Sequence, residues 1–111
     1  MSLLEEAKAY ANAEWPAILR DLEALVSIDS SQDLSSACAG APFGPGPRAA
    51  LDKATELMAA YGFTLNDCGG YCGYFDIPGK SDKQLGIIGH LDVADNSRFL
   101  VTRFPVSREL L

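Results

Sequence analysis

The fold is decided by the stretch LGIIGHLDV, which occupies residues 85–93. Its first half is apolar and contains two adjacent isoleucines, a composition typical of a buried strand. Its second half holds Asp92 and His90, which is the only histidine of the chain. In α/β sheets, ligands bind beyond the carboxyl ends of the strands. The stretch therefore predicts a strand over residues 85–89 that ends at a pair of functional side chains.

His90 and Asp92 are two residues apart, so in an extended chain both side chains point to the same face. A carboxylate in that place can accept the hydrogen of the imidazole nitrogen that does not face a metal, which fixes the tautomer. Direct ligation by Asp92 is an alternative with a more demanding geometry. A bare His-x-Asp is more often a surface or core histidine beside a turn carboxylate. The preceding strand and Gly89 shift the interpretation toward a metal site.

The first half of the chain predicts two helices. Apolar residues recur at steps of three and four over residues 3–28, which is the helical period. Pro16 interrupts this pattern and predicts either a kink or the first turn of a second helix. The segment 39–47 is rich in glycine and proline and predicts a loop. A second amphipathic helix is expected to begin at Pro47 and to be capped by Gly62.

After Gly62 the pattern changes to short apolar or alternating runs that predict strands. Three strands are expected, separated by turns at 66–70 and 78–83: Phe63–Leu65, Tyr71–Ile77 and Leu85–Gly89. The order of two helices and three strands favours an α/β layered sheet over a helical bundle. Most of the aromatic residues are interpreted as core and sheet packing, namely Trp15, Phe43, Tyr61, Phe63, Tyr71, Tyr74 and Phe75.

Composition limits the classes of function. A chain of 111 residues with 48% hydrophobic residues is typical of one soluble globular domain. A formal net charge of -6 argues against a nucleic-acid partner, which requires clustered basic residues. No leader sequence and no apolar run of about 18 residues is present, so we expect no membrane contact and a cytoplasmic location. An odd number of cysteines favours reduced thiols.

Two other motifs have simpler interpretations. Cys68 and Cys72 do not have Cys-x-x-Cys spacing, and the glycines between them favour a hairpin turn with free thiols over a functional pair. The glycine- and proline-rich loop lacks the Gly-Lys-Ser/Thr ending of a phosphate-binding loop. Arg48, which follows that loop, is the side chain there that could pair with a substrate carboxylate.

From about Ile18 to Val93 the sequence resembles the N-terminal part of a cytoplasmic dipeptidase in the aminoacylase/carboxypeptidase family of zinc metallopeptidases. Each matching segment is weak by itself, whereas their order and spacing are specific. The Pro-Phe-Gly-x-Gly loop indicates the dipeptidase branch. The matching segments are residues 21–30, 42–46, 50–63 and 85–93.

This resemblance implies a three-layer α/β catalytic domain, incomplete here, with flanking helices over residues 1–93. Two zinc ions of the complete site would polarise a water that attacks the peptide carbonyl of a short peptide. Carried over by position, His90 is a ligand of one zinc and Asp92 is the catalytic acid that orients it. No other residue of this chain maps onto a metal ligand, and the resemblance leaves the substrate-binding residues open.

Residues 94–111 depart from the family pattern, because no further metal ligands follow Val93. Instead, Val101–Ser107 resembles a strand and helix start of the family's lid domain. We therefore expect an internally deleted or truncated member that lacks a complete di-zinc site, since a catalytic zinc takes about three protein ligands plus water. Zinc need not bind at all. The alternative is a non-catalytic fragment or interaction module that self-associates through unpaired strand edges.

Overall fold

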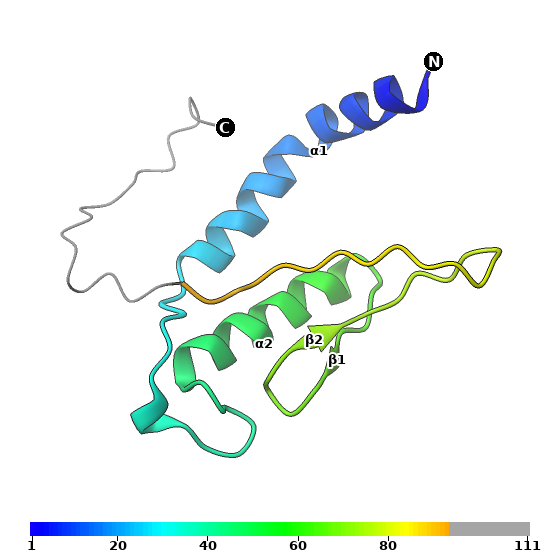
Figure 1. Ribbon diagram of the computed structural model, residues 1–111. Coiled ribbons are helices and arrows are strands. Elements are labelled where there is room, and N and C mark those ends of the chain that lie inside the picture. Colours follow the sequence, from blue (N-terminus) through cyan, green and yellow to red (C-terminus); the bar gives the residue numbers. More distant parts are fainter. Residues whose placement is uncertain (94–111) are drawn as a thin grey trace.

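The computed structural model describes residues 1–93, and the lid-like segment predicted at Val101–Ser107 lies outside the described residues. Residues 1–93 form two α-helices, a 3₁₀ turn and one small hairpin (Figure 1). These elements are α1 (Leu3–Val26), η1 (Leu34–Ser36), α2 (Pro45–Ala60), β1 (Asn66–Asp67) and β2 (Gly73–Tyr74). The described residues thus form a small mixed helix and sheet arrangement, which is compatible with part of an α/β fold.

Helix α1 begins at a capping box. The Ser2 side chain accepts from the Glu5 amide at 3.2 Å, and the Glu5 carboxylate accepts from the Ser2 amide at 2.9 Å, so two amides at the helix start are satisfied. Pro16 lies inside the helix, so the pattern predicted over residues 3–28 is one helix rather than two. No residue of α1 is buried, and its N-terminal half projects away from the other elements (Figure 1).

Helix α2 holds the small core, which consists of the buried residues Ala50 and Leu51. It begins at Pro45, two residues before the predicted start, and proline is well tolerated there because the first helical amides have no partner within the helix. At its end, the Gly62 amide donates to Ala59 and the Phe63 amide to Met58, each at 3.0 Å. This is a Schellman motif. The predicted glycine cap is confirmed.

The hairpin is shorter than the sequence predicted. Strands β1 and β2 pair antiparallel, with Asn66 opposite Tyr74 and Asp67 opposite Gly73. The first two residues of the predicted turn therefore belong to a strand, and the turn lies between Asp67 and Gly73. Gly70 has a φ of 83° and packs so closely on the carbonyl of Gly40 that a side chain would clash. This contact fixes the hairpin turn against the loop before α2.

The prediction of a buried strand over residues 85–89 is wrong for the described structure. This segment is extended without ladder pairing, and the side chains of Leu85, Ile87 and Ile88 are 87%, 91% and 98% exposed. A strand of this composition is normally covered by neighbours on both sides, and the described residues supply none. Among the described residues, the chain that follows this segment forms one parallel bridge, between Ser31 and Val93.

The aromatic residues pack only in part as predicted. Phe63 stacks on Phe75 with ring centroids 4.7 Å apart, and Phe43 meets the edge of Tyr71 at 5.6 Å. Four of the seven are substantially exposed, because the described residues put no second layer over them: Trp15, Tyr61, Tyr71 and Tyr74. Neither helix of residues 1–93 is long and apolar enough to span a membrane.

Candidate functional site

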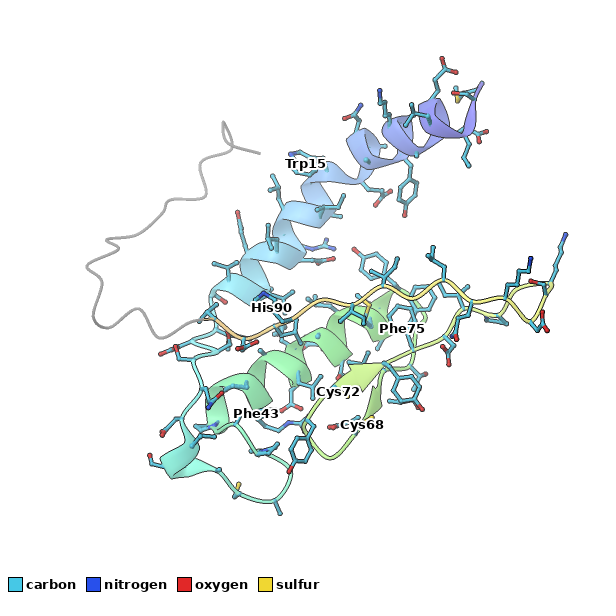
Figure 2. The ribbon with its side chains drawn as sticks, viewed as in Figure 1. Trp15, Phe43, Cys68, Cys72, Phe75 and His90 are labelled. Carbon is cyan, nitrogen blue, oxygen red and sulfur yellow. The ribbon has the colours of Figure 1, made fainter. Side chains whose placement is uncertain are left out.

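The segment that carries His90 and Asp92 is anchored at the C-terminal end of α1. The Ser30 hydroxyl donates to the carbonyl of Leu91 at 3.0 Å, and Ser30 is 2% exposed. Together with the bridge from Ser31 to Val93, this bond holds the residue between His90 and Asp92 in place. Figure 2 shows His90 where the extended segment reaches α1. No local sequence motif indicates this contact, because Ser30 and Leu91 are 61 positions apart.

The two predicted site residues are in contact. His90 Nδ1 lies 3.3 Å from Asp92 Oδ1 and 2.9 Å from the Asp92 carbonyl oxygen. Both acceptors favour a hydrogen on Nδ1, which leaves the lone pair on Nε2 available to a ligand. The imidazole is 84% exposed. The geometry is that of a histidine oriented by a carboxylate, whereas the roles of His90 as metal ligand and Asp92 as catalytic acid remain predictions.

The donor set of the described residues does not by itself form a metal site. Over residues 1–93, no group of three or more His, Cys, Asp or Glu side chains could hold a metal ion. A catalytic zinc takes about three protein ligands plus water. Nε2 of His90 therefore fits zinc as a single ligand, and the described part of the chain does not complete the site.

A largely apolar cavity of about 540 Å³ borders this pair. Its walls come from α2, from the hairpin and from residues 89–92. Its volume falls within the range of small-molecule sites, about 300–1,000 Å³. The sequence predicted that this helix is amphipathic, but not that the apolar side of α2 would line a cavity. The lining includes Leu51, Leu57, Met58, Leu65, Cys72 and His90.

Arg48 is engaged within the protein, so its guanidinium would have to leave internal partners before it could pair with a substrate carboxylate. Its guanidinium lies 2.6 Å from Asp52 and 2.7 Å from Asp67, and it donates to the Gly40 carbonyl at 3.1 Å. Hydrogen bonding by Asp52 and then Asp67 raises the pKa of Arg48. The Gly70 amide and Arg48 lower the pKa of Asp67. Arg48 thus joins α2, the loop before it and the hairpin.

Fold and site together are compatible with a segment of an α/β fold in which an exposed histidine, in contact with a carboxylate, borders a largely apolar cavity. Comparison with known sequences identifies related proteins. No family model matches the chain. The chain is 44% identical over 86 residues to the Beta-Ala-Xaa dipeptidase of Lactobacillus delbrueckii subsp. lactis. It is 43% identical over 76 residues to a Staphylococcus epidermidis protein named "Putative dipeptidase".

These matches cover 78% and 68% of this chain but only 18% and 16% of the two relatives. The chain therefore spans less than a fifth of the length of the relatives it matches. Over most of its own length it is homologous to a segment of dipeptidases, and the predicted resemblance is confirmed.

Proposed function

We propose that this chain contributes the first metal-ligand segment of a zinc-dependent dipeptidase, whose complete form hydrolyses short peptides. The single observation that carries the proposal is the contact between His90 Nδ1 and Asp92, which leaves Nε2 available beside the cavity. Homology to dipeptidases supports the reaction class. When bound, the zinc pair would polarise a water for attack on a peptide carbonyl.

The residues of this chain would prepare that site. Asp92 would hold the hydrogen of His90 on Nδ1, which leaves the lone pair of Nε2 free to bind a metal ion. We further propose that the chain by itself lacks a complete site, because one imidazole and one carboxylate do not satisfy a catalytic zinc.

The test combines a binding and an activity measurement on the purified chain. We expect zinc to bind weakly through His90. Binding should be visible as a shift of the imidazole NMR signals on addition of zinc, and His90→Ala should abolish it. Asp92→Asn should weaken this binding about tenfold, because partners that orient a ligand contribute about 10–100-fold in affinity. Imidazole signals that do not change when zinc is added would refute the role of His90 as a ligand.

The activity arm uses a panel of dipeptides with zinc or manganese. We expect no turnover by the chain alone. Robust turnover that is lost in His90→Ala would overturn the proposed incompleteness while supporting the peptidase assignment.

A cytoplasmic location is proposed on the three free cysteines, and the net charge of -6 supports the absence of a nucleic-acid partner.

A second candidate function is a non-catalytic module that self-associates. Its support is the exposed apolar segment containing Ile87 and Ile88, because unpaired extended edges recruit other strands. Sedimentation over a range of concentrations tests this candidate. Reversible dimers that Ile87→Lys dissociates would support it, and a concentration-independent monomer would remove its basis.

A further inference from the structure

The hairpin turn brings two cysteines together. The register that pairs Asp67 with Gly73 places Cys68 opposite Cys72 as the next pair along the hairpin. The Cys68 amide donates to the Cys72 carbonyl at 2.8 Å, which extends the pairing to these residues. Figure 2 shows the two cysteines close together near the end of the hairpin.

The two thiols can react and are within reach of each other. Both are free and exposed. Hydrogen bonding by the Cys72 side chain raises the pKa of Cys68, so the sulfur atoms are neighbours. Directly opposed, hydrogen-bonded residues of an antiparallel pair have Cα atoms about 5.5 Å apart. Disulfides span Cα separations of about 4.4–6.8 Å. The backbone is therefore already placed for a bond between these two residues.

We propose that Cys68 and Cys72 form a dithiol site that exchanges with small-molecule disulfides and closes to an intramolecular disulfide. The thiolate of one cysteine attacks a sulfur of the oxidant RSSR, which releases RS⁻ and forms a mixed disulfide. The second cysteine, as thiolate, then attacks the protein sulfur of that mixed disulfide and expels the second RS⁻. The two cysteines lose two electrons, and one RSSR is reduced to two thiols, which take up the two thiol protons.

Either cysteine can act as the first nucleophile, because both thiols are exposed and lie opposite each other in the hairpin. Cys72 also lines the cavity that His90 borders, so its oxidation would alter a wall of that cavity. Exposed disulfides are generally more easily reduced than buried structural ones. The disulfide between Cys68 and Cys72 would therefore be reduced or re-formed as the redox potential of the surroundings changes.

The test treats the fully reduced chain with oxidised glutathione, blocks the remaining thiols by alkylation and measures the intact mass without reductant. Cys38→Ser is the matched control, because it removes the lone cysteine and leaves the pair. Wild type and this control should each lose the mass of two hydrogen atoms from the Cys68–Cys72 pair. Cys68→Ser should instead retain a glutathione adduct on Cys72. Persistent adducts on both paired cysteines, or disulfide-linked dimers, would overturn the proposal.

A rate comparison separates the folded hairpin from mere sequence proximity. In the folded chain the mixed disulfide should resolve at least about tenfold faster than in urea, because the hairpin holds the two sulfurs at high effective concentration. Equal rates in the two conditions would show that the structure does not position the pair. Circular dichroism of each variant verifies that the helices are retained.

Discussion

At the scale of single residues, the contacts that matter are made by side chains whose partners are distant in sequence. Arg48 contacts Asp67 across 19 positions, and Ser30 reaches the carbonyl of Leu91 across 61. Neither pairing is visible as a local motif, because the hairpin and the returning segment must form before the partners meet. His90 and Asp92 are the exception, since their spacing alone places them on one face.

Arg48→Ala removes a guanidinium that joins three parts of the chain. The Arg48 side chain is 24% exposed, while its partners Asp52 and Asp67 are 64% and 38% exposed, so solvent screens each pair. We expect a loss of about 1 kcal/mol in the free energy of unfolding, measured by urea denaturation. Lys53→Ala, which breaks the exposed pair with Glu56, is the control and should change little. Equal losses in both variants would contradict the special role of Arg48.

At the scale of elements, one hydrogen bond links the two helices and makes their packing dependent on pH. The Tyr61 hydroxyl donates to Asp21 at 2.5 Å. This bond lowers the pKa of Asp21 and raises the pKa of Tyr61. The lowered Asp21 pKa stabilises the fold above the unfolded-state value near 3.9, and this stabilisation disappears as the pH falls. The raised Tyr61 pKa stabilises it below about 10, and this contribution is lost as the pH rises.

Tyr61→Phe should therefore remove part of the pH dependence at both ends. The expected result is a flatter plot of the urea midpoint against pH than the wild type shows. Tyr10→Phe, on an exposed part of α1, is the control and should leave the wild-type profile intact. A Tyr61→Phe profile that superimposes on the wild type would show that this hydrogen bond does not contribute.

The end of α2 depends on a glycine backbone. Gly62 has a φ of 87°, and no atom lies near the position of an added Cβ. Gly62→Ala should thus destabilise the chain only through the left-handed backbone, by about 1 kcal/mol. Gly79→Ala has equally open surroundings and lacks a positive φ, so it should be neutral in the same urea denaturation. If both variants unfolded alike, the Schellman motif would not be the stabilising feature.

At the scale of the whole molecule, the sequence predicts what is local and misses what depends on absent neighbours. The period of α2 and its cap at Gly62 were predictable because both depend on residues within a few positions. The sequence pattern also predicted a strand over 85–89, which the described structure does not form. Its hydrogen bonds would require partner strands that residues 1–93 do not supply. The three-layer order of the sheet therefore remains a prediction, and the zinc site shares this dependence on further ligands.

The open cavity and the exposed segment 85–89 are both apolar surfaces, and no other layer of the described residues covers either of them. An apolar fluorescent dye such as ANS should bind the folded chain, as it binds other exposed hydrophobic surface. Ala54 lines the cavity from α2, so Ala54→Phe should fill part of it and weaken dye binding severalfold while the helices remain. Ala13→Phe, on the outer half of α1, is the control and should leave dye binding unchanged. Equal binding by Ala54→Phe and wild type would place the dye elsewhere, with the exposed isoleucines as the next surface to test.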